Sequence, residues 1–168
     1  CESLERAPSI PNTVIDLFYT FYDCKKLEQS PSIPNGVINM NSTFSDCVSL
    51  IKAPIIPENV INMGGTFYGC TLLTNVPNIP SKVTDMGITF YYCESLTTVP
   101  AIPSMVDMME ETFNGCKMLE GEIEINANPS ETKGCFNGTK KSIILTGTAS
   151  NETKERLKNT SSGNITWK

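Results

Sequence analysis

The sequence predicts an α/β repeat solenoid, in which a stack of similar coils shares one continuous core. Two observations lead to this prediction. Six of the seven cysteines recur every 23 residues, and leucine, isoleucine, valine and phenylalanine recur at fixed places in the same period. Such a period is typical of short-coil solenoids. The cysteines in phase are Cys1, Cys24, Cys47, Cys70, Cys93 and Cys116.

Each coil is expected to hold one short strand and one segment of turns. The template C-x-x-L-x-x-x-P-x-I-P-x-x-V-x-x-M-x-x-T-F-x-x occurs five times over residues 1–115. Proline cannot donate to a β ladder, which places the strand before the first proline, at residues 4–7 and their equivalents. The Val, Met and Phe columns fall at the helical spacing i, i+3 and i+7. Because Gly64, Gly65 and Gly87 interrupt them, we expect short helical or 3₁₀ turns.

The repeat array is predicted to end in a degenerate coil. Residues 116–138 keep Leu119, Ile125 and Phe136 in phase but lose both prolines. Residues 1–138 are therefore predicted as the array, with five regular coils and a sixth irregular one.

Residues 139–168 are predicted as a C-terminal cap. A strand is expected at 142–146, a helix with an N-cap serine at 150–158, and a strand at 164–167. A polar, atypical end unit is what covers the open core of a solenoid. The other end starts in mid-pattern without methionine, so we expect a fragment of a longer array or a processed chain. Its open first coil could pair with another chain.

Composition argues against several functions. The chain has 13 basic and 18 acidic residues, a formal net charge of −5, and no histidine. The negative charge disfavours nucleic acid as a partner. The lack of histidine removes Ser-His-Asp and Cys-His nucleophiles and zinc sites that need imidazole. No apolar run approaches 18 residues, so no membrane insertion is expected. We predict no enzyme, no cofactor and no metal.

The repeated L-x-x-x-P-x-I-P-x-x-V, followed by M-x-x-T-F-x-x-C and S-L, resembles the BspA-like leucine-rich-repeat surface proteins of bacteria. The resemblance covers residues 1–116 closely and 117–138 loosely. It implies a right-handed leucine-rich-repeat superhelix. It also implies an extracellular or cell-surface location and a role in adhesion or protein–protein interaction.

The cysteine column has two interpretations. Stacked strands lie about 4.8 Å apart, within disulfide range for Cα atoms, but side chains in a ladder run parallel and no Cys-x-x-Cys pair occurs. We therefore favour buried free thiols over disulfides or metal ligands. Cys1 could be a lipoprotein cysteine, but its place in the repeat phase favours a structural role.

The side chains of two polar columns are expected to form hydrogen bonds with backbone groups. The threonines should bond nearby carbonyl groups in tight turns, and the Asp/Asn column should cap turns or form a solvated ladder. Asparagines interrupt the carboxylates of that column, which argues against a calcium ladder. The two columns are Thr20, Thr43, Thr66, Thr89 and Thr112, and Asp16, Asn39, Asn62 and Asp85.

Variable columns beside the predicted strand are the first candidates for ligand binding, because a repeat keeps its core constant and varies its exposed positions. If the strand lines a concave face, these residues form a mixed polar floor suited to a host extracellular protein or a glycan. The alternative is ordinary solvated surface. The candidates are Glu5, Arg6, Glu28, Gln29, Lys52, Asn75, Asn78, Thr97 and Thr98.

Four tyrosines are a second candidate: Tyr22, Tyr68, Tyr91 and Tyr92. Exposed tyrosines at coil spacing can stack on sugars or anchor a protein partner. The interpretation that we favour is that they pack on the phenylalanine column and cover the convex side.

Three functions compete. The first is a non-catalytic interaction module, and the second is a spacer that displays another domain. The third, a polysaccharide-active enzyme, would need clustered carboxylates, which the coils lack, and their single arginine is Arg6.

Overall fold

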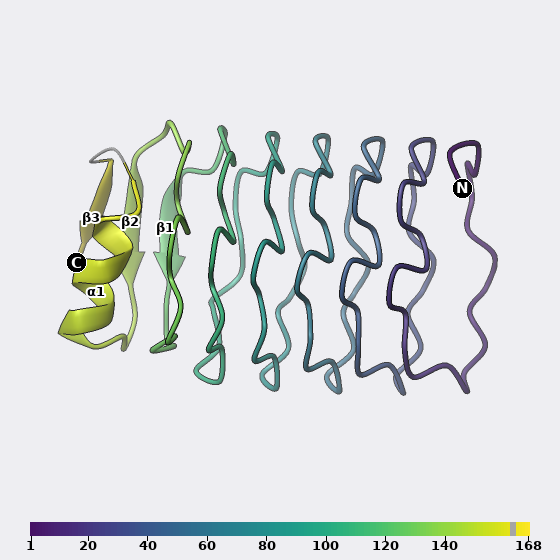
Figure 1. Ribbon diagram of the computed structural model, residues 1–168, viewed down its shortest axis with the longest axis horizontal. Helices are drawn as coiled ribbons and strands as arrows, with labels where there is room; N and C mark the ends of the chain where they lie inside the picture. Colours follow the sequence, from purple (N-terminus) through teal and green to yellow (C-terminus); the bar gives the residue numbers. More distant parts are fainter. Residues whose placement is uncertain (162–163) are drawn as a thin grey trace.

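The computed structural model describes residues 1–161 and 164–168. The chain forms a stack of coils that runs from the N-terminus at one end to the C-terminus at the other (Figure 1). Equivalent residues of neighbouring coils pair in parallel, as Arg6 pairs with Gln29 and Asp16 with Asn39. The predicted repeat solenoid is therefore what the chain forms, with two long sides per coil.

The first side is the strand side. In the first four coils each strand is reduced to a single bridge, in the row from Arg6 through Gln29 and Lys52 to Asn75, and the fifth coil has no bridge at the equivalent Thr98. The prolines explain this, because they supply no N–H to extend the ladder. Where the sixth coil loses the two repeated prolines, a four-residue strand forms, β1 (Gly121–Glu124). The strands of the regular coils are therefore shorter than the four residues that we predicted.

Two more strands continue the ladder of β1. They are β2 (Ile143–Thr146) and β3 (Ile165–Trp167), and the three strands form a parallel sheet in the order β1-β2-β3. Gly121 pairs with Ile143, and Ile143 pairs with Ile165. The strand side thus keeps one direction along the stack.

The second side is a ribbon of tight turns, which we call the turn ribbon and which comprises residues 15–23 and their equivalents. Its N–H groups alternate between two kinds of partner. Ser42 N–H donates to Gly64 O of the next coil at 2.9 Å, whereas Thr43 N–H turns back to Met40 O at 3.1 Å. Every second N–H group is therefore bonded between coils.

In each coil, two residues of the turn ribbon have the left-handed backbone conformation, which stops a helix after one turn. The helical or 3₁₀ turns that we expected are therefore wrong, and single turns linked between coils take their place. The left-handed residues are Tyr19, Asp23, Ser42, Asp46, Gly65, Gly69, Ile88, Tyr92, Glu111, Gly115, Gly134 and Gly138.

The core consists of ladders of identical side chains. Each phenylalanine from Phe21 to Phe136 stacks on its equivalent in the next coil, with ring centroids 5.2–5.8 Å apart. The Leu, Met and Val columns of the second to fifth coils are buried beside this stack. Each coil therefore contributes one rung to a core that it shares with its neighbours.

From the second coil on, the cysteine column is buried in the core, as predicted, and so is the threonine column, whereas Cys1 and Thr20 of the first coil are exposed. All seven cysteines are free, and Cys1 alone is exposed. The thiol of Cys70 donates to Phe44 O, 26 residues earlier in the chain, at 3.1 Å, and burial raises the pKa of Cys47 to about 12. The hydroxyl of Thr66 donates to Met63 O and Met40 O. These groups link successive coils inside the core.

The Asp/Asn column also behaves as predicted, because its side chains cap the turns. Asp16 Oδ1 accepts from Phe18 N–H at 2.8 Å, and Asp85 Oδ1 accepts from Gly87 N–H at 2.9 Å. Asn39 makes the same bond and also donates to Asp16 Oδ1. The column is thus both a set of caps and, at its start, a short ladder.

A helix takes the place of the turn ribbon at the C-terminal end (Figure 1). The helix α1 (Asn151–Lys158) begins at the N-cap Ser150, whose hydroxyl accepts from Thr153 N–H. Arg156 donates to Pro129 O and Ser130 O of the preceding coil at 2.6 and 2.9 Å. The expected strand, helix and strand are present, while the boundary at residue 139 between array and cap stays a prediction. Within the described residues, no helix is long and apolar enough to cross a membrane.

Candidate functional site

The strand side brings four of the predicted residues into one straight row. Arg6, Gln29, Lys52 and Asn75 are joined by consecutive parallel bridges, and all four are exposed. Because neighbouring coils lie about 4.8 Å apart, the row is about 14 Å long. Backbone bridges fix the spacing of these side chains, so they form a continuous polar surface.

Two shallow hollows open beside the start of this row. One, of about 350 Å³, is lined by Glu5, Arg6, Lys26, Glu28 and Ser49. The other, of about 260 Å³, lies between the second and third coils and shares Glu28 with the first. Acidic and basic side chains are mixed here, as the sequence predicts. Lys26 and Ser49 were missed, because they lie one position before the leucine column and only stacking brings them beside the row.

The remaining strand-side candidates divide into free and engaged side chains. Thr98 is exposed. Thr97 is also exposed, and its hydroxyl donates to Thr74 O at 3.3 Å. Asn78 is half-buried, and its amide both accepts from Ile56 N–H at 3.1 Å and donates to Ile56 O at 2.8 Å. These two bonds resemble a β bridge to Ile56. They explain the asparagine at position 78 by a structural role, so no ligand is needed to explain it.

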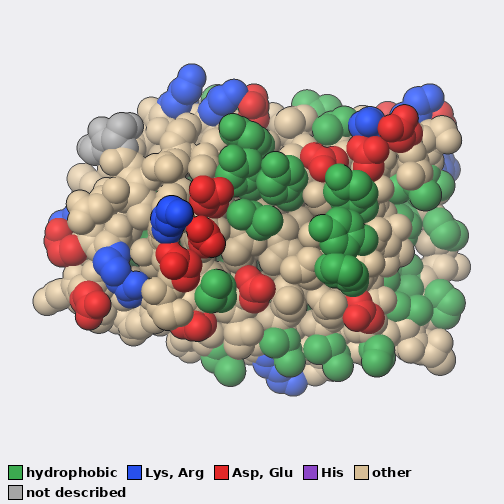
Figure 2. Space-filling model, in the orientation of Figure 1, with side chains coloured by type: hydrophobic (Ala, Val, Ile, Leu, Met, Phe, Trp, Pro, Cys, Tyr) green, Lys and Arg blue, Asp and Glu red, His purple; other side chains and the backbone are tan. Residues whose placement is uncertain are grey.

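The predicted tyrosines form two separate groups on the turn ribbon. Tyr68 and Tyr91 stack in parallel with centroids 5.0 Å apart, and Tyr92 meets Tyr91 edge-on at 4.5 Å. Tyr22 instead contacts Tyr19, which the candidate set omitted, at 5.2 Å. Figure 2 shows two gatherings of hydrophobic side chains on this side.

The tyrosine rings pair with one another, while each phenylalanine stacks on the phenylalanine of the next coil. The interpretation that the tyrosines pack on the phenylalanine column therefore does not describe these contacts. Tyr92 is 46% exposed and Tyr22 45% exposed. Burial raises the pKa of Tyr68, and a hydrogen bond with Tyr92 raises the pKa of Tyr91, so both phenols are neutral at physiological pH.

No group of three or more His, Cys, Asp or Glu side chains is placed to hold a metal ion within residues 1–161 and 164–168. The polar groups nearest the strand-side row are amides, hydroxyls and isolated charges. Such a surface can bind by hydrogen bonds and ion pairs.

The stacked coils, with their leucine column and parallel bridges, define a leucine-rich-repeat solenoid. The chain belongs to the BspA-type leucine-rich-repeat family. The family model described as the BspA type leucine rich repeat region matches residues 1–120 in six copies. No curated protein and no solved structure matches the chain. Members of this family are repeat proteins of protein interaction or adhesion, generally non-enzymatic and typically associated with bacterial surfaces.

Proposed function

We propose that this chain is a non-catalytic interaction module of a secreted or cell-surface protein, and that it binds a host extracellular protein or glycan through the strand side. The observation that carries the proposal is the row Arg6, Gln29, Lys52 and Asn75. Its residues differ from coil to coil, while the backbone bridges beneath them are the same.

The rigidity of the row favours binding. Each residue of the row follows a leucine of the core ladder by two positions, and Leu27, Leu50 and Leu73 are fully buried. A surface that is already ordered loses little conformational entropy when a ligand docks. The side chains of Arg6, Gln29 and Lys52 are long and exposed, so they can reach a partner without a change in the backbone.

The mixed charge of the surface indicates the class of ligand. The hollow beside the row is lined by two carboxylates, Glu5 and Glu28, and two cations, Arg6 and Lys26. A surface without a dominant charge does not select polyanions. It suits a protein or a neutral saccharide, which present donors and acceptors together.

The test is a fourfold alanine variant at Arg6, Gln29, Lys52 and Asn75, screened with the unchanged protein against extracellular-matrix proteins and a glycan array. We expect the variant to lose the binding and to keep its thermal midpoint, because exposed side chains contribute little to stability. A matched control changes another exposed column, Asn12, Asn35, Glu58 and Ser81, to alanine.

Binding that survives the strand-side variant, or that both variants lose, would contradict the proposed site. If the folded protein binds none of the targets, the spacer function becomes the better interpretation.

A further inference from the structure

The turn ribbon has a composition that sets it apart from the rest of the chain. Its first five segments contain all five tyrosines, seven carboxylates and none of the thirteen lysine and arginine residues. In Figure 2 the blue side chains lie at the edges of this side and over the C-terminal coils. The carboxylates are Asp16, Asp23, Asp46, Asp85, Asp107, Glu110 and Glu111, and the segments are residues 15–23, 38–46, 61–69, 84–92 and 107–115.

Most of this negative charge is not balanced within the protein. Among the described residues, Asp23 is the one of these seven carboxylates that forms an ion pair, with Lys25 at 3.3 Å. All seven are at least partly exposed. The field of six unpaired carboxylates on one side of a narrow stack favours a cationic partner.

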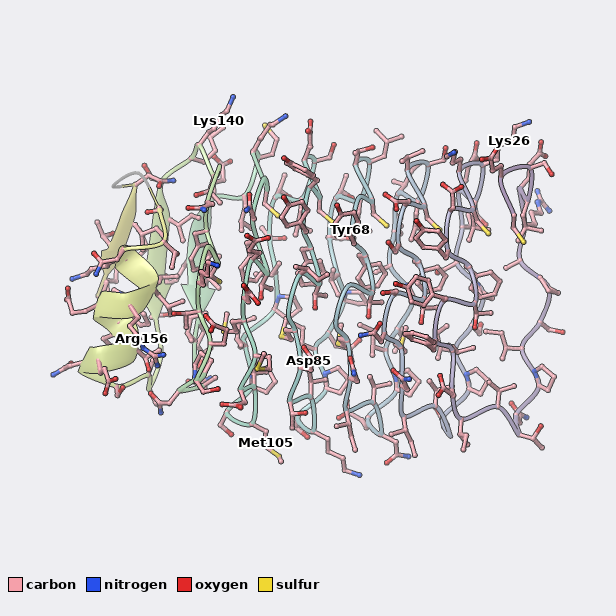
Figure 3. All side chains as sticks on the ribbon, viewed as in Figure 1. Lys26, Tyr68, Asp85, Met105, Lys140 and Arg156 are labelled. Atoms are coloured by element: carbon pink, nitrogen blue, oxygen red, sulfur yellow. The ribbon has the colours of Figure 1, made fainter. Side chains whose placement is uncertain are left out.

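A groove of about 320 Å³ lies in the middle of this side. Tyr19 of the first coil lines one end, Glu110 of the fifth coil lines the other, and Asp85 lies between them. Four coil spacings of about 4.8 Å make the groove about 19 Å long. An extended peptide of about six residues has this length. Figure 3 shows Asp85 on the same side of the stack as Tyr68.

Two glycines form the floor of the groove, and the backbone conformation of neither requires glycine. Gly64 and Gly87 do not have the left-handed conformation, and the same column holds Phe18, Asn41 and Glu110 in other coils. A Cβ atom added at Gly87 would meet its nearest neighbour at 3.4 Å, an ordinary contact. Glycine at position 87 therefore leaves open a space that a side chain would fill, whereas the space over Gly64 is already taken by the ends of the Asn41 and Asp85 side chains.

Polar atoms border the open space over Gly87. Asp85 Oδ1 accepts from Gly87 N–H, which fixes the carboxylate. Its other oxygen lies over Gly64, where a Cβ atom would meet it at 3.1 Å and would meet Asn41 Nδ2 at 2.9 Å. An ordered carboxylate above an open floor is suited to a guanidinium or ammonium group.

We propose that this groove binds an extended, arginine- and lysine-bearing segment of a partner protein. A basic side chain enters above Gly87 and pairs with Asp85, and the next basic residue along the segment reaches Glu110. Tyr19 offers an exposed ring for a cation–π contact at the end of the groove. This site lies on the turn ribbon and is independent of the strand-side site.

The test measures fluorescence anisotropy of a labelled arginine-rich peptide of about eight residues, slightly longer than the groove. Its control is the same peptide with citrulline at each arginine, which keeps the shape and removes the charge. We expect binding of the arginine peptide only, and a marked loss of affinity between about 0.05 and 0.5 M salt, because screening shortens the reach of charges.

Three protein variants locate the site. The double variant Asp85→Asn, Glu110→Gln should weaken the arginine peptide about tenfold, since each exposed ion pair contributes a few-fold. Asn39 and Asn62 occupy the Asp85 column, so the cap is kept. Gly87→Asn should block the floor, as Asn41 does in its own coil. The control Glu120→Gln, Glu122→Gln removes the same charge from the strand side and should bind as the unchanged protein does.

The proposal is overturned if the citrulline peptide binds equally well or if the Asp85/Glu110 variant binds as tightly as the control. It is also overturned if the variants instead lose binding to a neutral glycan, which would make the groove a saccharide site. The fourfold strand-side alanine variant should bind the arginine peptide normally. This result separates failure of this proposal from failure of the strand-side function.

Discussion

The left-handed column of the turn ribbon makes a sharp prediction at Gly65. This residue has φ +60°, and a Cβ atom there would lie 3.0 Å from Ser42 Oγ. A left-handed alanine costs about 1–2 kcal/mol, and the close contact adds to that cost. The smaller freedom of alanine in the unfolded chain offsets about 0.4–1 kcal/mol. Gly65→Ala should therefore lower the free energy of unfolding by about 1 kcal/mol.

The measurement is urea unfolding followed by circular dichroism, with Gly36→Ala as the matched control. Gly36 is not left-handed, and its added Cβ would meet nothing closer than Val14 O at 3.6 Å. The same column holds Thr13 and Asn59 in neighbouring coils. Gly36→Ala should leave stability unchanged or raise it by about 0.4–1 kcal/mol.

The two alanine variants should therefore differ by more than 1 kcal/mol, or about 2–4 °C in thermal midpoint for a chain of this size. Equal stability of Gly65→Ala and Gly36→Ala would mean that the left-handed turn does not form. In that case the linked turns, and the groove that lies on them, would be wrong.

Two further predictions concern titratable groups. At a pH of about 8.5, iodoacetamide should modify Cys1 and spare the six buried cysteines until urea is added. The reason is that burial raises the pKa of their thiols, and the thiolate is the reactive form. Mass spectrometry counts the adducts, and rapid labelling of Cys47 in the folded protein would contradict the buried ladder. Burial and the charge of Asp23 raise the pKa of Asp46 above its ordinary 3.8. The folded state therefore binds the carboxyl proton of Asp46 more tightly than the unfolded state does. The stability that this bound proton contributes is lost as the pH rises through the folded pKa. Asp46→Asn should therefore raise the thermal midpoint at neutral pH and have a smaller effect below pH 3.8, and an effect of the same size at both would refute this cause.

The core could be predicted from the sequence because each of its ladders repeats one residue type in phase. Phe44, Phe67 and Phe90 occupy one column, and the structure stacks them on one another. The proline columns also indicated that strands would be short. They did not indicate how short, because the length of a ladder depends on every N–H group in both coils.

The turn ribbon could not be predicted because its spacing matches that of a helix. What breaks the helix is the left-handed conformation, and it occurs at Ile88 and Glu111 as well as at Gly65. Isoleucine and glutamate give no local signal for that conformation. The conformation is imposed by hydrogen bonds to the next coil, such as Ile88 N–H to Glu110 O at 2.8 Å, and these exist only in the stack.

The candidate sites follow the same division. A fixed column becomes a straight row in a stack, so the strand-side row could be predicted from its repeat positions. The groove on the turn ribbon combines Tyr19, Asp85 and Glu110, which come from three different columns and three different coils. No periodic pattern connects them, and only the packed coils bring them to one wall.

Because the register of the ladders is constant, the stack can change length without a change in how its coils pair, while its binding surface does change. If residues 47–69 were deleted, Phe44 would meet Phe90 and the thiol of Cys93 would reach Phe44 O, so every rung would find the same kind of neighbour. The groove would nevertheless lose Gly64 from its floor. Whole coils can thus be gained or lost without changing how the remaining coils pair, and each such change creates a new surface.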